Sequence, residues 1–411
     1  MLYALFDWLE THYDIPGAGL FRYISFRSSA ALILSLIIAI GIGDKIIRYL
    51  RRRQIGETIR ELGLEGEQSK AGTPTMGGII IIAAIVIPVL LLCDLTNMYI
   101  QLLLLSVLWL GAIGMVDDFI KIFHKKKEGL KAKVKLIGQV TLGTIVGIIL
   151  WWHPQSVVRM DYQRAVSHDY PIQKVVETDD ARYAYVKSTL TNLPFVKDNA
   201  FDYNLVVGGN DGLQWIGWLV YVVAIIFILT AVSNAANLTD GLDGLLAGVG
   251  AIIGVALGIF AYVSGNTVIS EYLKILYLPH TAELVILSAA FVGACVGFLW
   301  YNSYPASVFM GDTGSLTIGG VIAILAITLR KELLIPILCG VFFAESLSVI
   351  LQVAYFKYTK RKYGKGRRIF RMSPLHHHFQ KMGLHEAKIV TRFWIVQVFL
   401  AVLTVVTLKI R

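Results

Sequence analysis

A short polar loop between two long apolar runs carries a single carboxylate, Asp312, between two glycines. Thr313 and Ser315 lie beside it, and the aromatic Phe309 precedes it by three residues. Glycines allow backbone N–H groups to approach a ligand closely, and an aspartate can bind a hard cation through oxygen. The alternative is a plain turn between two helices, because Gly and Pro pairs are ordinary turn signals.

Two adjacent carboxylates, Asp117 and Asp118, end another apolar run. Charges at the hydrocarbon boundary are costly unless a cation or another partner offsets them. Mg²⁺ prefers oxygen ligands and is often held by one or two carboxylates together with substrate phosphates. Lys121 follows Asp117 by about one helical turn and could pair with it or meet a phosphate. The pair therefore predicts a Mg²⁺ site, the alternative being two solvated charges at a helix end.

A third polar stretch places Asp240 and Asp243 among the glycines Gly241 and Gly244. If this stretch is helical, the two carboxylates share one side; if it is a loop, the glycines expose backbone N–H groups. Either form suits a nucleotide or a metal better than a plain turn does. An EF-hand is excluded, because the glutamate at the twelfth position of a calcium loop is absent.

Three consecutive histidines, His376, His377 and His378, lie between Pro374 and Phe379. They cannot all face one way on a helix or strand, so one or two of them can reach a shared site. Zinc is one possibility, but no cysteine is nearby and the other motifs offer carboxylates, which favours a hard cation. The basic run just upstream indicates that the histidines contact an anionic substrate.

Lys70 belongs to a fifth polar stretch, with Thr73 and Thr75 ahead of the pair Gly77 and Gly78. A cation and two hydroxyls next to a glycine-rich helix start are also suited to an anionic ligand.

The composition is that of a membrane protein. The chain has 411 residues, of which 56% are hydrophobic and only 16% charged, and its mean hydropathy is +0.64. Soluble domains carry about 25% charged residues. The net charge of +10 does not indicate nucleic acid, because Lys and Arg cluster between apolar runs as in cytoplasmic loops. Cys93, Cys295 and Cys339 all lie in apolar runs and are expected to pack there without disulfides or zinc.

The apolar runs predict an all-α polytopic membrane protein with about ten transmembrane helices, and 1–411 as a single integral membrane domain. No cleavable signal peptide is expected, because the first apolar run is too long for one. The expected spans are approximately 24–47, 76–94, 98–116, 134–152, 214–233, 245–264, 282–300, 315–329, 333–356 and 390–410.

Loop charges give an orientation. The basic segments 44–75, 117–133 and 357–389 all follow odd-numbered spans, which places them in the cytoplasm and both termini outside. The polar segment 153–213 follows the fourth span and is therefore expected to be a small extracytoplasmic insertion, periplasmic in a bacterium. All five polar motifs follow odd-numbered spans, so they face the cytoplasm together and predict one composite site.

These motifs resemble those of the polyprenyl-phosphate N-acetylhexosamine-1-phosphate transferase superfamily. Three of them are fairly specific to it: Asp117-Asp118-Phe-Ile-Lys121, Asn-Leu-Thr-Asp240-Gly-Leu-Asp243-Gly and Phe309-Met-Gly-Asp312-Thr-Gly-Ser315. The run Pro374-Leu-His376-His377-His378-Phe379 is similar to that of the bacterial phospho-N-acetylmuramoyl-pentapeptide-transferase (MraY) family in particular. The resemblance covers nearly the whole chain apart from 153–213.

The sequence departs from this family in two places. The insertion is longer than the usual short loop, and Gln380 stands where family members often have Glu. Neither departure is expected to touch the inferred chemistry.

The resemblance implies transfer of phospho-MurNAc-pentapeptide from UDP-MurNAc-pentapeptide to undecaprenyl phosphate, giving lipid I and UMP, with Mg²⁺ required. It also implies a multi-pass protein of the bacterial cytoplasmic (inner) membrane, with its active site facing the cytoplasm, and a homodimer. On this reading Asp312 is the leading Mg²⁺ ligand and Asp118 assists the metal. Asp117 positions or deprotonates the lipid phosphate.

The resemblance also implies the remaining site residues. Uridine recognition falls on Lys70, Gly241, Leu242, Asp243, Asn302 and Phe309, with Phe309 stacking on the base. Pyrophosphate and sugar contacts fall on Asn237, Asp240, His376 and His377, the last two also counted as catalytic. Further expected substrate contacts are Thr75, Lys121, Lys133, Gly311, Ser315 and His378.

Two other functions are compatible with parts of the sequence. A sister transferase that loads N-acetylglucosamine phosphate would share most motifs and differ in its sugar nucleotide. An ion-coupled transporter would carry charges near the middle of its spans and matching repeated halves. Here the carboxylates lie at span ends and no inverted repeat is evident. A membrane scaffold would leave the five polar motifs unexplained.

Overall fold

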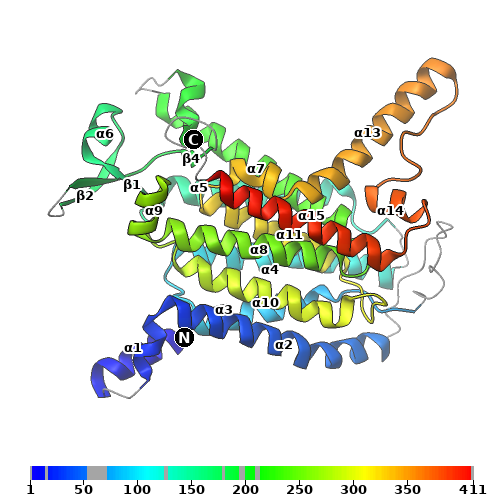
Figure 1. Cartoon of the computed structure of the whole chain (residues 1–411), viewed down its shortest axis with the longest axis horizontal. Coiled ribbons are helices and arrows are strands. Elements are labelled where there is room, and N and C mark those ends of the chain that lie inside the picture. Colours follow the sequence, from blue (N-terminus) through cyan, green and yellow to red (C-terminus); the bar gives the residue numbers. More distant parts are fainter. Residues whose placement is uncertain are drawn as a thin grey trace.

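The chain forms a bundle of long, roughly aligned helices, shown in Figure 1. The structure, a computed structural model, describes residues 2–13, 17–52, 72–124, 128–177, 181–193, 200–208 and 213–408. Within these residues, nine helices are long and apolar enough to cross a membrane, and the shorter apolar helix α3 (Gly78–Leu92) lies among them. The nine are α2 (Ile24–Arg52), α4 (Met98–Phe123), α5 (Ala132–Trp152), α7 (Gln214–Thr239), α8 (Leu245–Ser264), α10 (Glu283–Asn302), α11 (Gly311–Thr328), α13 (Gly340–Tyr363) and α15 (Glu386–Thr407). The predicted polytopic helical fold with about ten spans is therefore confirmed.

Helix α11 lies at the centre of the bundle, although its short apolar run made it an inconspicuous span. Of the 18 residues of this helix, 94% are buried inside the protein. Small residues allow this close packing: a Cβ on Gly319 would lie 2.6 Å from the Cα of Ser233 in α7, and one on Gly320 would lie 2.1 Å from Leu110 in α4. In a membrane, such small-residue contacts let helix backbones approach one another.

The ninth span is interrupted. A short 3₁₀ helix η6 (Glu332–Leu334) and the helical turn α12 (Ile335–Leu338) precede Cys339, and α13 begins after it. Pro336 lies in the first turn of α12, where a missing N–H is tolerated. Helix α13 then projects away from the bundle (Figure 1).

The described residues of the insertion form two small antiparallel sheets with short helices, so the chain is not helical throughout. One sheet has the strand order β1-β3-β2 and the other pairs β4 with β5. The elements are β1 (Val158–Asp161), α6 (Tyr162–Ser167), β2 (Ile172–Glu177), β3 (Arg182–Val186), β4 (Leu190–Asn192), β5 (Ala200–Asp202) and η4 (Tyr203–Val207). Strand β4 docks on the bundle, because the Asn192 N–H donates to the carbonyl of Arg330, just beyond α11, at 2.9 Å.

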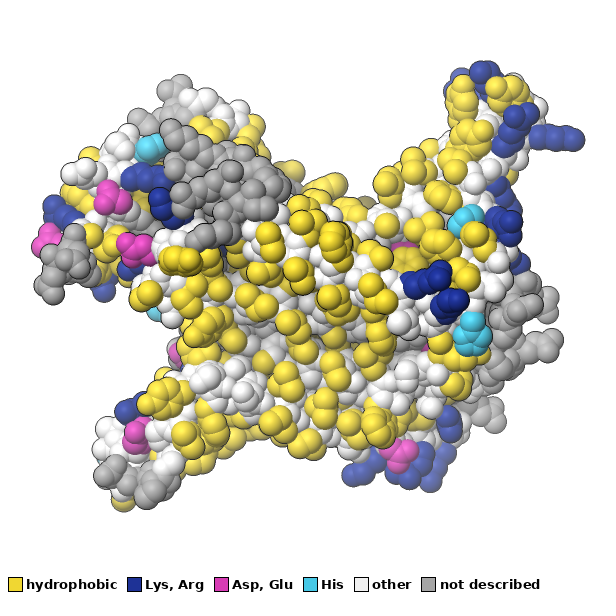
Figure 2. All heavy atoms as spheres, viewed as in Figure 1, with side chains coloured by type: hydrophobic (Ala, Val, Ile, Leu, Met, Phe, Trp, Pro, Cys, Tyr) yellow, Lys and Arg dark blue, Asp and Glu magenta, His cyan; other side chains and the backbone are white. Residues whose placement is uncertain are grey.

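The bundle therefore has two ends, which we name by what they carry. The insertion end carries the two sheets, α9 (Thr267–Leu273) and, as Figure 1 shows, α1 (Leu2–Tyr13) with η1 (Ala18–Arg22) and the end of α15. The site end carries the C-terminal ends of α4, α7 and α10, the N-terminal end of α11 and the short helix α14 (Leu375–Gln380). Hydrophobic side chains cover the face between the two ends, as Figure 2 shows, and charged side chains gather toward the ends.

Candidate active site

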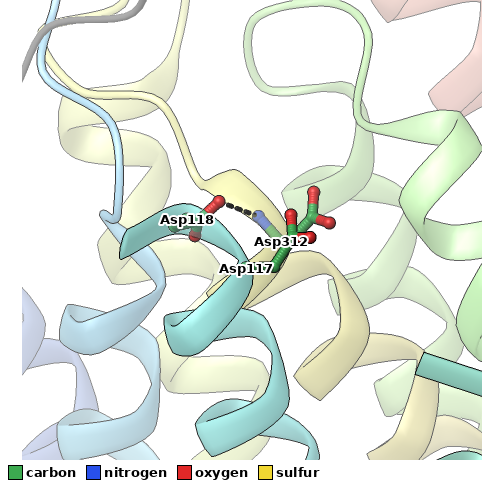
Figure 3. A group of neighbouring side chains, drawn as sticks. All are labelled: Asp117, Asp118 and Asp312. Carbon is green, nitrogen blue, oxygen red and sulfur yellow. Dashed lines mark hydrogen bonds between the residues drawn. The ribbon is translucent and has the colours of Figure 1, made fainter. Parts of the chain in front are cut away.

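Three carboxylates meet at the site end, as Figure 3 shows. Asp117 and Asp118 lie in the last two turns of α4, and Asp312 lies in the first turn of α11. Each offers an oxygen that lies within 4.8 Å of those of the other two. The sequence prediction that Asp312 lies within a metal's reach of Asp117 or Asp118 is thus confirmed.

Asp118 binds the N-terminus of α11. Its Oδ1 accepts the Asp312 N–H at 3.0 Å, the dashed bond of Figure 3, and its Oδ2 accepts the Thr313 N–H at 2.9 Å and the Thr313 hydroxyl at 2.6 Å. A carboxylate at this place offsets both the unpaired N–H groups and the positive end of the helix dipole. Asp118 therefore fixes the position of Asp312 relative to α4.

Two lysines bridge the other two carboxylates. Lys121 Nζ lies 2.6 Å from Asp117 Oδ2 and 3.1 Å from Asp312 Oδ1. Lys135, from the first turn of α5, lies 2.8 Å from Asp117 Oδ1 and also pairs with Asp312. Asp117 is fully buried, whereas Asp312, Lys121 and Lys135 keep 13%, 31% and 19% of their side chains exposed. Asp312 and the two lysines are therefore partly accessible from outside the protein.

Glycines bring these elements close enough to form the cluster. A Cβ on Gly114 of α4 would lie 2.3 Å from the carbonyl oxygen of Asp312, and one on Gly129 would lie 2.5 Å from Asp117 Oδ1. Gly129 also has a φ of +60°, and the next residue, Leu130, donates its N–H to Asp117 Oδ1 at 2.7 Å. Gly129 and Leu130, just ahead of α5, therefore lie against Asp117, and Lys135 in the first turn of α5 lies at the carboxylates.

Thr75 reaches the cluster from the segment before α3. The N–H groups of Gly77 and Gly78 donate to the carbonyls of Phe309 and Met310, both at 2.9 Å, so the two polar loops pair with each other. Thr75 is buried, and a Cβ on Gly311 would lie 3.0 Å from its hydroxyl. Gly311 itself has a φ of +70°, which explains why a glycine opens α11.

The Asp240–Gly244 stretch forms a turn between α7 and α8, so the loop alternative for it is the correct one. Asp243 Oδ2 accepts the Ala306 N–H at 3.0 Å, and Asn302 Oδ1 accepts the Gly244 N–H at the same distance. The turn and the loop before α11 therefore hold each other. Leu242 is buried within it.

Asn237, in the last turns of α7, connects this turn to α11. Its side-chain amide donates to the Ser315 hydroxyl at 2.9 Å, and that hydroxyl donates to the Gly311 carbonyl at 3.1 Å. Asp240 then caps the end of α7.

The histidine run lies on α14 and adjoins the same turn. His376 is buried, and a Cβ on Gly241 would lie 2.1 Å from its Nε2, so only a glycine fits there. Its Nδ1 lies 3.1 Å from Glu345 Oε2, and Glu345 comes from α13 and is itself fully buried. His376 is therefore held between α13 and the Asp240–Gly244 turn. The sequence analysis did not single out Glu345, which stands alone in an apolar run.

His377 and His378 are half-buried and have different partners. His377 Nδ1 lies 2.7 Å from Gln380 Oε1, and His378 Nδ1 accepts the Arg371 N–H at 3.1 Å. One turn of α14 thus brings the departure at Gln380 into contact with His377, and its lack of effect on the inferred chemistry stays a prediction.

The described residues of all five polar motifs contact one another, and comparison with known proteins then decides the family. Residues 100–330 match the family model described as glycosyl transferase family 4, and residues 70–82 match the first signature of phospho-N-acetylmuramoyl-pentapeptide-transferase. Over the full length of both chains, proteins of that name from Flavobacterium psychrophilum and Parabacteroides distasonis are each 57% identical, and one from Porphyromonas gingivalis (ATCC 33277) is 53% identical. The chain belongs to the phospho-N-acetylmuramoyl-pentapeptide-transferase family.

The family signature coincides with a structural contact. Its residues 70–82 include Thr75, Gly77 and Gly78, which pair with the loop that leads into Asp312. Lys70, the first residue of the signature, lies outside the described residues.

The structure adds detail at two predicted positions. The sequence places Asp117 and Asp118 at the end of an apolar span, and the helix α4 itself continues to Phe123. Of the two lysines on either side of Val134, Lys133 is exposed, and Lys135 is the one that meets the carboxylates. The signal that could have identified Lys135 is its helical phase: it shares a face with Gln139, which is buried against α7.

Proposed function

We propose that this chain transfers phospho-MurNAc-pentapeptide from UDP-MurNAc-pentapeptide to undecaprenyl phosphate, releasing lipid I and UMP. The observation that carries the proposal is the cluster of Asp117, Asp118 and Asp312 with Lys121 and Lys135, set at one end of a membrane bundle in a chain of this family. The activity of the family requires a nucleotide sugar as donor and a lipid carrier in the membrane as acceptor.

In this reaction a phosphate oxygen of the lipid bonds to the phosphorus that bears the sugar, and the bond from that phosphorus to the bridging oxygen breaks. UMP leaves with the bridging oxygen and its electron pair. We assign direct attack to the lipid phosphate, because a phosphate monoester is already anionic at neutral pH. The main task of the protein is then to position two anionic groups and to offset their charge.

The donor set fits a divalent cation. Three carboxylates within 4.8 Å of one another supply the oxygen ligands that Mg²⁺ prefers. We propose that Asp312 is the leading ligand of this ion and that Asp117 and Asp118, which already bind protein groups, flank it. The ion would supply charge neutralisation on the pyrophosphate.

The contacts of Asp117 favour a positioning role. It accepts the Leu130 N–H and pairs with Lys121 and Lys135, so its oxygens are already engaged. Lys121 and Lys135 are partly exposed, and their ammonium groups can reorient from the carboxylates toward phosphate oxygens. We therefore assign charge neutralisation on the departing UMP to these two lysines.

The turn and the loop that adjoin the cluster suit the rest of the donor. Phe309 is half-buried beside the cluster, and we propose that it stacks on the uracil ring. His376 adjoins Gly241 of the Asp240–Gly244 turn, and we place the sugar and pyrophosphate beside His376 and His377.

We also propose that residues 1–411 form one integral membrane transferase domain of the bacterial cytoplasmic membrane. The site end would face the cytoplasm, where the nucleotide donor is made, and 153–213 would form a periplasmic insertion. The expected homodimer stays a prediction.

A donor comparison tests this proposal. Purified protein in nanodiscs that contain undecaprenyl phosphate is given either UDP-MurNAc-pentapeptide or UDP-N-acetylglucosamine, with Mg²⁺ or with EDTA, and UMP release is measured. We expect release from the muramoyl donor only, and only with Mg²⁺. Faster release from the N-acetylglucosamine donor would assign the chain to the sister activity, and no lipid-dependent release from either would remove the proposal.

A further inference from the structure

The end of α13 and the segment after it carry an unusual excess of cations. Between Glu345 and Glu386 the sequence has no Asp or Glu, and in 357–371 alone it has eight Lys and Arg residues: Lys357, Lys360, Arg361, Lys362, Lys365, Arg367, Arg368 and Arg371. We call residues 357–371 the basic arm. In Figures 1 and 2 it forms the projecting tip at the site end, with Lys and Arg gathered on it.

The basic arm is a built hairpin. The Thr359 hydroxyl accepts the Arg367 N–H at 2.8 Å, which folds the returning segment onto α13. Gln352, which is 9% exposed, accepts the N–H groups of Ile369 and Phe370 at 3.0 Å each and donates to the Phe370 carbonyl at 3.1 Å. These bonds hold the cations in a fixed array.

The side chains along α13 change where a membrane boundary would lie. Its middle part exposes apolar residues, such as Ile350 at 63% and Val353 at 45%. Tyr358 and Tyr363 follow among the lysines, with 57% and 52% exposed. Tyrosine prefers the headgroup level, and Lys and Arg beside it can extend to lipid phosphates. This order predicts that α13 leaves the hydrocarbon at about residue 357.

The cations of the basic arm lack carboxylate partners in the described part of the chain. Their contacts are with aromatic rings and neutral oxygens: Arg367 lies 4.7 Å from the Tyr363 ring, and Arg371 donates to the Lys381 carbonyl at 3.0 Å. A dense array of unneutralised charge is favourable next to a surface of opposite charge.

The arm also runs directly into the histidine helix. Arg371 donates its N–H to His378 Nδ1 at 3.1 Å, and α14 begins four residues later, at Leu375. Whatever holds the arm therefore also sets the position of α14.

We propose that the basic arm binds the headgroups of anionic phospholipids at the membrane surface, and that this binding places α14 against the active site. An anionic substrate in solution is the competing occupant, and the test separates the two. The inference rests on the proposed function only for its second readout.

The test compares charge-matched variants in the full-length protein. In the arm variant, K360Q, R361Q and K362Q remove three charges. The control K45Q, R48Q and R52Q removes three charges from α2 at the same end of the bundle. These cations are also exposed, but one of them, Arg48, pairs with Asp44. A second control, K360R, R361K and K362R, keeps the charge of the arm. None of these residues belongs to the active site.

The first readout is lipid binding. Native mass spectrometry measures retention of phosphatidylglycerol against phosphatidylcholine by each protein. Because each Lys or Arg near an anionic surface adds about 1 kcal/mol of binding free energy, we expect the arm variant to bind phosphatidylglycerol at least about tenfold more weakly. The two controls should stay within about twofold of the wild type.

The second readout is UMP release in nanodiscs, with the lipid carrier saturating. The wild type should become faster when phosphatidylcholine is partly replaced by phosphatidylglycerol, and the arm variant should lose this gain while it keeps its rate in phosphatidylcholine. Undiminished lipid retention by the arm variant would overturn the proposal, as would equal losses in the α2 control. A raised KM for the nucleotide donor with normal lipid retention would assign the arm to the substrate instead. Lipid retention is measured by mass, so it stands even if the donor has been assigned wrongly.

Discussion

The two ends of α11 both bury charged side chains, but they do so in different ways. At the site end, Asp312 faces Lys121 and Lys135, and all three remain partly exposed. At the insertion end, Lys331 is fully buried, and its ammonium donates to neutral oxygens, among them Asn192 Oδ1. The site end therefore pairs opposite charges that a ligand can reach, whereas the insertion end seals a lysine side chain away from solvent.

The neighbours of Lys331 complete the contrast. Arg330 lies 4.7 Å from the Tyr221 ring and is buried, and Glu332 accepts from the Tyr203 hydroxyl at 3.3 Å. Burying charged groups without a close opposite charge costs free energy. Here the contacts of these groups join the segment after α11 to the insertion and to α7. The comparison teaches that exposure and charge pairing, more than burial alone, separate a cluster that a ligand can reach from a structural one at the two ends of the same helix.

The largest effect should come from Asp312→Asn, which removes a charge from the proposed metal site and keeps its shape. Because the ion contributes several kcal/mol of charge stabilisation in the transition state, we expect kcat for UMP release to fall by roughly 10³-fold or more. The thermal unfolding midpoint should stay close to that of the wild type. Near-normal turnover would move the reaction away from this end of α11.

Lys135→Met should have the next largest effect, with Lys133→Met as its matched control. Lys135 pairs with two carboxylates, whereas Lys133 is exposed. Loss of one preorganised charge contact costs about 10²-fold in kcat. The Lys133 variant should stay within about threefold, because an exposed charge contributes little. Equal effects of the two substitutions would contradict the geometry.

Asp118→Asn should cost both stability and activity, because an amide cannot accept every bond that the carboxylate accepts from α11. Loss of a helix cap costs about 1–2 kcal/mol of unfolding free energy. We expect a lower unfolding midpoint and kcat reduced about tenfold through misplacement of Asp312. Thr313→Val removes only the hydroxyl bond and should show a smaller change in the same direction. A stable but inactive Asp118 variant would instead support direct metal ligation.

The smallest effect on activity is expected at the insertion end. Burial lowers the pKa of Lys331 from its ordinary value of 10.5 to about 7. Between these two values the unfolded chain binds more protons than the folded chain, so folding stability should rise with pH across that window. Lys331→Met should weaken this rise and leave kcat nearly unchanged, whereas Lys174→Met, on the exposed strand β2, should alter neither. Thermal unfolding midpoints of the three proteins, measured from pH 7 to pH 10, test this. The same rise in stability with pH in Lys331→Met and in the wild type would contradict the prediction.

The sequence predicted the fold well, because the apolar runs are long and the loops between them are charged. It also placed the five motifs on one face, and the structure brings Asp117, Asp118 and Asp312 together as expected. It could not show that Asp118 caps α11, since that bond joins residues 194 positions apart. Nor could it choose Lys135 over Lys133, because the phase of α5 depends on how α5 packs.

The insertion and Glu345 were beyond such reasoning for different reasons. The two small sheets of 153–213 lack long periodic runs, and their docking depends on carbonyls beyond α11, such as that of Arg330. Glu345 became recognisable only when the fold placed His376 3.1 Å away. A single carboxylate in an apolar run carries no spacing from which a partner can be inferred.

The central claim is that the site end of α11 holds a divalent cation between carboxylates. Mn²⁺ binding followed by electron paramagnetic resonance tests it most directly, because Mn²⁺ shares the preference of Mg²⁺ for oxygen ligands and is read without turnover. We expect a bound Mn²⁺ in the wild type that Mg²⁺ displaces and that Asp312→Asn abolishes, with Lys331→Met binding as the wild type does. Equal Mn²⁺ affinity in the wild type and in Asp312→Asn would contradict the account.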